Sequence, residues 1–219
     1  MRRRSKFALA AAGLVGASAL AFAVAGEHGD FLKGDPVLAQ LPVGKAVPNF
    51  RANDVNGRPV SLADFRGKTV VLEWSNPECP TVQKHYESGN MQKAQAVAAA
   101  DGVVWLTVNS SGEGKQGYLS PVEAKAFAAS QQSRRTAYLL DPKGEVGRSY
   151  GATATPHMYV INSSGTLVYS GGIDDKPSTD KDDIASARNH VLAALVELKA
   201  GKPVSVPTSR PYGCSVKYG

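Results

Sequence analysis

The chain has 219 residues, with 25 Lys and Arg against 19 Asp and Glu, so its formal net charge is +6. The length fits one globular domain with tails, and 42% hydrophobic residues suffice for a packed core, which excludes wholesale disorder. Two cysteines are too few for a disulfide-scaffolded miniprotein or for a four-cysteine zinc site.

The first 25 residues have the layout of a secretory signal peptide. Basic residues within 2–6 precede an uncharged run of apolar and small residues over 7–25, and Ala23-Val24-Ala25 is an A-x-A-like cleavage site. We expect cleavage after Ala25 and a periplasmic or secreted protein. The alternative is an uncleaved anchor, the only case in which the protein would be tethered to a membrane.

Removal of the predicted signal peptide changes the charge balance. It takes away four of the 25 basic residues and none of the 19 acidic ones, which leaves 21 against 19 and a net charge of +2. No basic stripe with interleaved aromatic residues remains, so we expect no nucleic-acid partner. In an oxidising compartment the two cysteines could pair.

The first predicted elements follow a polar N-terminal arm over 26–40, and the folded domain is expected over 41–201. Segments 47–50 and 59–62 flank Asn56-Gly57, which is a strong signal for a β-hairpin. The β-branched run 69–74 predicts a buried central strand. A helix is expected over 81–100, with Pro80 near its first turn.

Strands and helices alternate further along the chain. Strands are predicted over 103–108 and 137–140, and a short helical turn over 145–150. Between the two strands, Ser120-Pro121-Val122-Glu123 is a capping box with proline at the first helical position, so a helix is expected to run to about Ser133.

The last elements are two strands over 157–162 and 166–169, and a helix from Asp182 or Asp183 to Lys199. The aspartates of segment 174–183 are expected in a solvated loop and a helix cap. Residues 202–219 are expected to form a mobile tail that carries Cys214. A hairpin that follows a βαβ unit gives a mixed sheet with helices on both faces, hence an α/β domain.

Cys79 is predicted to lie where a buried strand leads into a helix. A thiol at that point faces the unpaired N–H groups and the positive end of the helix dipole, and both favour the thiolate. The thiolate is the nucleophile in disulfide exchange and in attack on peroxide. The neighbouring Glu78 acts in the opposite direction, since an adjacent carboxylate raises the pKa of a thiol.

Cys214 lies 135 positions after Cys79, and two cysteines allow only one intramolecular pair. A bond that closes this loop would stabilise the fold by about 4–5 kcal/mol through the entropy of the unfolded chain. A structural bond between the tail and the core is therefore an alternative to a redox pair.

The sequence resembles the redoxin, or AhpC/TSA, family of thioredoxin-fold proteins, and in particular its extracytoplasmic, peroxiredoxin-like members. The matching segments, within residues 41–219, are VGKAVPNF, SLADFRGKTVVLEWSNPECP, YGATATPHMYVINSSGTLVYSGGIDD and PYGCSVKY. The resemblance implies a thioredoxin-like fold in which Thr155-Pro156 is the family's cis-proline, next to the active cysteine. There it leaves a backbone edge open for an extended thiol substrate.

The sequence departs from two patterns of the family. Val82 stands where a C-x-x-C motif has its second cysteine, so no local dithiol exists. Asn76 and Leu72 stand where peroxiredoxins have threonine and proline, although Cys79-Pro80-Thr81 matches their C-P-T. Among the arginines, residues 134, 135 and 148 are all conceivable partners of a peroxide. Peroxidase activity and disulfide exchange both stay open.

The resemblance implies a thiol-dependent oxidoreductase without a cofactor. Its nucleophile would be Cys79 and its resolving cysteine Cys214, with substrate contacts from Thr155, Pro156, Asn76 and Pro80. The implied partners are a peroxide or a protein disulfide as substrate and a thioredoxin-like reductant. The alternative is a redox-silent, thioredoxin-like binding module with a structural Cys79–Cys214 disulfide.

Two histidines are candidates for assisting the chemistry of Cys79. His85 or His157 could act as a base, or with Met158 as part of a copper(I) site. We expect no metal, because two close cysteines are missing, and both histidines are interpreted as surface residues or as core residues with hydrogen-bond partners.

Overall fold

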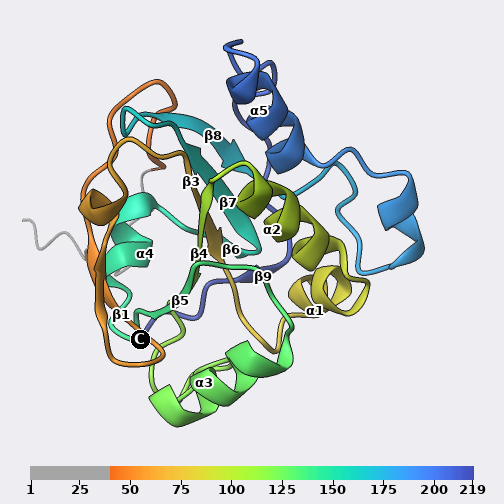
Figure 1. Cartoon of the computed structure of the whole chain (residues 1–219). Coiled ribbons are helices and arrows are strands. Elements are labelled where there is room, and N and C mark those ends of the chain that lie inside the picture. Colours follow the sequence, from red (N-terminus) through yellow and green to blue (C-terminus); the bar gives the residue numbers. More distant parts are fainter. Residues whose placement is uncertain (1–39) are drawn as a thin grey trace, which may run out of the picture. The chain divides into compact units, whose positions relative to one another are not determined.

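The computed structural model describes residues 40–219, and Figure 1 shows their arrangement. The predicted signal peptide and residues 26–39 of the predicted arm lie outside the described residues. Within 40–219, none of the helices combines the length and the apolar character that a membrane span requires.

A seven-stranded mixed sheet forms the centre of the domain, in the order β2-β1-β5-β4-β3-β7-β8. Strands β3, β4 and β5 are parallel, whereas β7, β8, β1 and β2 join by antiparallel pairing. The strands are β1 (Arg51–Asp54), β2 (Pro59–Ser61), β3 (Val70–Trp74), β4 (Val104–Asn109), β5 (Ala137–Leu140), β7 (His157–Ile161) and β8 (Leu167–Gly171). The predicted mixed α/β sheet is confirmed.

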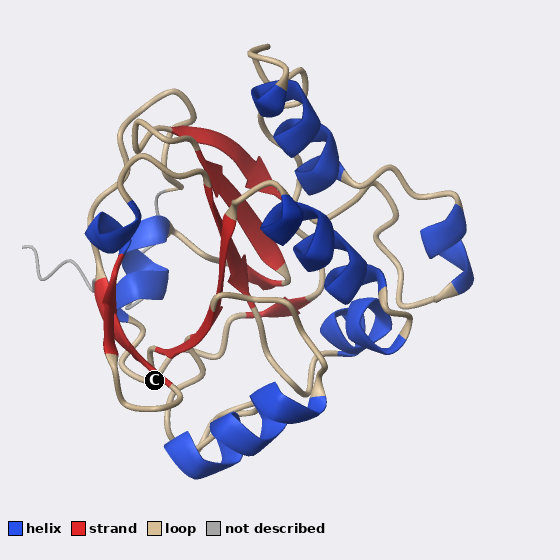
Figure 2. Cartoon of the chain, viewed as in Figure 1, coloured by secondary structure: helices blue, strands red, loops and turns tan. Residues whose placement is uncertain are grey.

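Five α-helices accompany the sheet in the described part of the chain. Figure 2 draws the helices in blue around the red strands. They are α1 (Pro80–Glu87), α2 (Asn90–Ala100), α3 (Pro121–Ser130), α4 (Glu145–Tyr150) and α5 (His190–Lys199). Helices α1, α2 and α5 lie on one side of the sheet and α4 on the other (Figure 1). The predicted capping box of Ser120 and Glu123 opens α3, with both of its hydrogen bonds formed.

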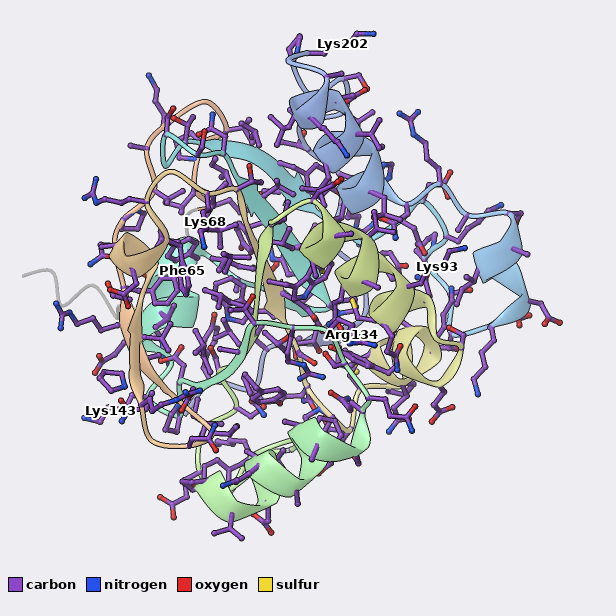
Figure 3. The ribbon with its side chains drawn as sticks, in the orientation of Figure 1. Phe65, Lys68, Lys93, Arg134, Lys143 and Lys202 are labelled. Atoms are coloured by element: carbon purple, nitrogen blue, oxygen red, sulfur yellow. The ribbon has the colours of Figure 1, made fainter. Side chains whose placement is uncertain are left out.

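Successive residues of the central strands face two different core clusters, because side chains alternate along a strand. From β3, Val71 packs with α1, α2 and α5. Its neighbour Leu72 packs in the second cluster, with Val146 and Tyr150 of α4. Charged side chains such as Lys143 and Lys202 point away from the fold (Figure 3).

The predicted hairpin is present, but its first strand begins later than expected. Segment 47–50 is not a strand, and β1 runs from Arg51 to Asp54. The Asp54 side chain accepts hydrogen bonds from the backbone N–H groups of Asn56 and Arg58. This turn fixes the register in which Asn53 pairs with Pro59.

Two predicted helices are wrong in their limits. The helix expected over 81–100 is broken into α1 and α2 at Gly89, which has a left-handed φ of 75° and starts the second helix. The last helix begins at His190, where the Asn189 side chain accepts from the N–H of Leu192. Residues Asp182–Ala185 form a separate 3₁₀ turn, and an isolated antiparallel bridge pairs Asn189 with Asp174 in the loop after β8.

A buried glutamate in β3 joins the sheet to the helices next to it. Glu73 is fully buried, and its carboxyl oxygens accept from the Trp105 indole at 2.8 Å and the Thr107 hydroxyl at 3.0 Å, both on β4. They also accept from the Tyr86 hydroxyl of α1 at 2.8 Å and from Gln95 of α2 at 3.4 Å. Helix α1 is thereby fixed relative to the sheet.

Candidate active site

Cys79 lies at the predicted junction of strand and helix. Five residues after the end of β3 it forms the N-cap of α1 with extended backbone angles, and Pro80 is the first helical residue. The Cys79 side chain is completely buried, whereas Glu78 and Pro80 on either side are exposed.

The C-terminal tail, expected to be mobile, is docked over Cys79. Its residues Cys214–Ser215 form β9, which pairs antiparallel with β6 (Ala154–Thr155), and Thr155 is the direct partner of Cys214. Figure 1 shows the two short strands side by side. The peptide bond between Thr155 and Pro156 is cis.

This pairing brings both cysteines and Thr155 together. The Cys79 thiol donates to the Thr155 carbonyl oxygen, with 3.1 Å between sulfur and oxygen, and the N–H of Cys214 points to the Cys79 sulfur at 3.4 Å. The Thr155 hydroxyl donates to the Cys214 carbonyl oxygen at 3.3 Å. Both cysteines are free thiols, and Cys214 is partly exposed.

The two thiols differ in acidity. Burial acts to raise the pKa of Cys79, but the side chains of Cys214 and Thr155 and the N–H groups of Val82 and Cys214 lower it, so that the pKa is below its ordinary value. Burial, the hydrogen bond to Cys79 and the Cys79 charge raise the pKa of Cys214 to about 11. Cys79 therefore loses its proton first and is the better nucleophile at neutral pH.

Replacement of Cys214 by alanine is expected to raise the pKa of Cys79, because it removes the hydrogen bond that lowers it most. In a pH titration followed by thiolate absorbance, Cys79 of the variant would then ionise at a higher pH than Cys79 of the unmodified protein, which gives the first of two steps there. Cys214→Ser keeps a hydrogen-bond donor, so the pKa of Cys79 in this variant should lie closer to its value in the unmodified protein. A midpoint for the alanine variant equal to or below that of the unmodified protein would contradict this role of Cys214.

Asn76 and Pro80 lie close to Cys79 but differ in their surroundings. The Asn76 amide oxygen accepts from the N–H of Glu78 at 2.8 Å, and its amide nitrogen donates to the Gln116 carbonyl at 3.2 Å. Both polar groups of Asn76 thus organise the loop before Cys79. Pro80 lines a shallow hollow of about 530 Å³ beside Cys214, together with Thr81, Pro177, Ser178, Thr179, Tyr212 and Gly213.

The histidines are buried core residues with hydrogen-bond partners. His157 lies within hydrogen-bond distance of Thr153, Tyr159 and Ser170, and burial lowers its pKa to about 3. His85 contacts Asn90 and Tyr212. Among residues 40–219, no three His, Cys, Asp or Glu side chains are grouped closely enough to hold a metal ion.

The arginines considered from the sequence have partners away from Cys79. Arg135 lies over the rings of Tyr86 and Tyr138, and Arg148 lies over the ring of Tyr218. The backbone N–H of Arg134 donates to the Gln95 side chain. Within residues 40–219, no arginine side chain has a hydrogen bond with the Cys79 sulfur, which contacts Thr155 and Cys214.

Sequence reasoning missed the groove in which the tail lies. Residues 209–219 run against glycines from separate segments of the chain, and a Cβ on any of these four would collide with the tail: Gly112, Gly144, Gly147 and Gly171. Gly213 itself has a φ of 114° and lies against the Thr155 carbonyl. The sequence signal was the PYGC motif, whose tyrosine and glycine precede Cys214 directly.

Comparison with known proteins agrees with this fold. The model of the AhpC/TSA family matches residues 43–170. One relative is the thiol-disulfide oxidoreductase ResA of Bacillus thuringiensis subsp. konkukian, 24% identical over 129 residues, which are 59% of this chain and 69% of the relative.

Two solved structures resemble most of the described domain. An uncharacterised conserved protein from Geobacillus kaustophilus has a TM-score of 0.69 and 26% identity, over 81% of this chain and 93% of that one. A hypothetical protein from Sinorhizobium meliloti has a TM-score of 0.66 and 23% identity, over 83% and 97%. The thioredoxin-like fold implied by the resemblance is confirmed.

Proposed function

Because the chain belongs to the AhpC/TSA family and is a thiol-dependent oxidoreductase, we propose that it exchanges disulfides with other proteins, with Cys79 as nucleophile and Cys214 as resolving cysteine. The observation that carries the proposal is the pairing of β9 with β6, which holds the Cys214 N–H 3.4 Å from the Cys79 sulfur. Two thiols of unequal acidity then lie in direct contact.

In the first step the Cys79 thiolate attacks one sulfur of a substrate disulfide. The substrate S–S bond breaks, a mixed disulfide forms on Cys79, and the second substrate sulfur leaves as a thiolate that takes up a proton from water. The lowered pKa of Cys79 makes the attacking thiolate available.

In the second step the Cys214 thiol gives its proton to water, and the resulting thiolate attacks the Cys79 sulfur of the mixed disulfide. The Cys79–Cys214 bond forms, the first substrate sulfur leaves as a thiolate, and the substrate has gained two electrons. The Cys79 charge is one of the causes that raise the pKa of Cys214. Since the mixed disulfide carries no such charge, the pKa of Cys214 falls when its attack is required.

The surroundings of Cys79 favour exchange over attack on peroxide. Asn76 replaces the threonine hydroxyl of peroxiredoxins, and both of its polar groups are occupied by the loop. No arginine among residues 40–219 donates a hydrogen bond to the Cys79 sulfur. An extended polypeptide already pairs with β6, as a protein substrate would.

We assign the remaining predicted site residues to substrate binding in the same scheme. Thr155 and Pro156 would form the edge that pairs with the substrate once β9 has moved off it, and Pro80 the wall of the hollow beside it. Asn76 would keep the loop before Cys79 in place. The sequence of residues 1–25 supports a periplasmic or secreted location for this chemistry.

A thioredoxin-like dithiol would restore the reduced protein by attack on Cys214. In the docked structure Cys214 is partly exposed, whereas Cys79 is completely buried. Cys79 is also the more acidic thiol and therefore the better leaving group.

Reaction of the reduced protein with a disulfide-bonded protein substrate tests the proposal. Mass mapping is expected to find one Cys79–Cys214 bond for each substrate disulfide reduced. The oxidised product, treated briefly with glutathione, should carry its first adduct on Cys214. An unreduced substrate with both thiols still free would contradict the proposed function.

The complete burial of Cys79 favours a second candidate function, a binding module in which the Cys79–Cys214 bond is a permanent structural link. A bond of this kind resists reduction, so the reduction potential separates the two functions.

A further inference from the structure

Tyr212 is the tail residue that comes two positions before Cys214. Between them, Gly213 lies so close to the Thr155 carbonyl that a side chain would collide with it. The chain has little freedom at this point, so the position of Tyr212 largely fixes the position of Cys214.

The Tyr212 hydroxyl lies between two buried side chains from other parts of the fold. It donates to the Asp174 carboxyl in the loop after β8, and it lies 3.2 Å from Nε2 of His85 on α1. Asp174 is 3% exposed and His85 is fully buried. We call these three residues the Tyr212 cluster.

The partners of His85 define the direction of these hydrogen bonds. The Asn90 amide lies 2.8 Å from Nδ1 of His85, which leaves Nε2 to carry the proton and donate to Tyr212. Burial lowers the pKa of His85 to about 4, with Asp174 acting against this shift and Lys84 adding to it. The ring is therefore neutral at pH 7, and hydrogen bonds run from His85 to Tyr212 to Asp174.

The Tyr212 cluster joins the two segments that carry the cysteines. His85 belongs to α1, the helix that begins directly after Cys79, and Tyr212 belongs to the tail that carries Cys214. Asp174 is fixed by a second hydrogen bond, from the N–H of Lys176 at 3.0 Å. Movement of the tail away from α1 would break these contacts.

We propose that Tyr212 is a positioning residue for disulfide formation, which keeps Cys214 within reach of Cys79 through its hydroxyl contacts to Asp174 and His85. The proposal rests on the proposed function, since it concerns the same pair of cysteines. Loss of the hydroxyl leaves the pairing of β6 and β9 but lowers the effective concentration of Cys214 at Cys79.

The test is the reduction potential of the Cys79–Cys214 pair in the full protein, measured in glutathione buffers. Tyr212→Phe is expected to lower the effective concentration about tenfold, which raises the potential by about 30 mV. Asp174→Ala should shift the potential by a similar amount. Asp174→Asn keeps an acceptor oxygen, so its potential should stay close to that of the unmodified protein. The double variant Tyr212→Phe/Asp174→Ala should shift no further than one single variant.

Tyr150→Phe is the matched control, because its hydroxyl donates to the Pro48 carbonyl at 2.6 Å in the second core cluster. It loses a comparable hydrogen bond and should leave the potential unchanged. Equal reduction potentials for the Tyr212 and Tyr150 variants, or additive shifts in the double variant, would overturn the positioning role of Tyr212. The proposed function would still stand after either result. Failure of the unmodified protein to form the bond at any potential would overturn the proposed function as well.

Discussion

Replacement of Cys79 by serine is expected to reduce disulfide exchange by roughly a thousandfold or more, because a serine hydroxyl is not ionised at neutral pH and cannot attack a disulfide. Replacement of Cys214 by serine should have a different result. The first step still takes place, but the mixed disulfide on Cys79 persists because no second thiol lies against it. Mass spectrometry of the intact protein, with mapping of the modified peptide, detects this adduct.

Ser215→Ala is the control for both cysteine variants. Ser215 is the exposed neighbour of Cys214 on β9 and pairs with Ala154 through its backbone, so the variant should keep full activity. Retained activity in the Cys79 variant, or rapid release of substrate by the Cys214 variant, would show that the roles of the two cysteines are wrongly assigned.

Replacement of Glu73 by alanine is expected to lower the free energy of unfolding by about 3–5 kcal/mol, since donors buried around the carboxyl group would lose their acceptor. The donors come from α1, α2 and β4, so the loss affects the contact between sheet and helices. Denaturant unfolding measures the change. Glu73→Gln keeps one acceptor oxygen, so its free energy of unfolding should fall by about half as much as that of Glu73→Ala.

Glu113→Ala serves as the matched control, because Glu113 is an exposed loop residue and should contribute less than about 0.5 kcal/mol. A Glu73→Ala variant as stable as this control would show that the donors around the carboxyl group find other partners. If the Glu73→Ala variant lost disulfide exchange activity while its free energy of unfolding stayed unchanged, Glu73 would instead have a role in the exchange reaction.

The sequence was sufficient where local patterns determine structure. The apolar run around Val71 and Leu72 predicted the central strand, and Ser120 with Glu123 predicted the start of α3. The position of Cys79 between a buried strand and a helix-opening proline followed from the same local rules. The family resemblance implied that Thr155 lies beside Cys79, and its carbonyl oxygen accepts from the Cys79 thiol.

The sequence was insufficient where structure depends on distant contacts. The break at Gly89 requires a left-handed conformation that a periodic pattern does not reveal. The docking of the tail depends on β6 and on glycines from separate segments of the chain, so the PYGC motif of the tail did not by itself reveal where the tail docks. Asp174 was expected in a solvated loop, but it is buried because Tyr212, 38 positions away, covers it.

The reduction potential of the Cys79–Cys214 pair in the unmodified protein tests the central claim most directly. A pair that takes part in exchange is expected to have a potential above about −300 mV, within the range in which thioredoxin-like dithiols exchange electrons. A potential well below about −300 mV would contradict the proposed exchange and identify the bond as a structural link.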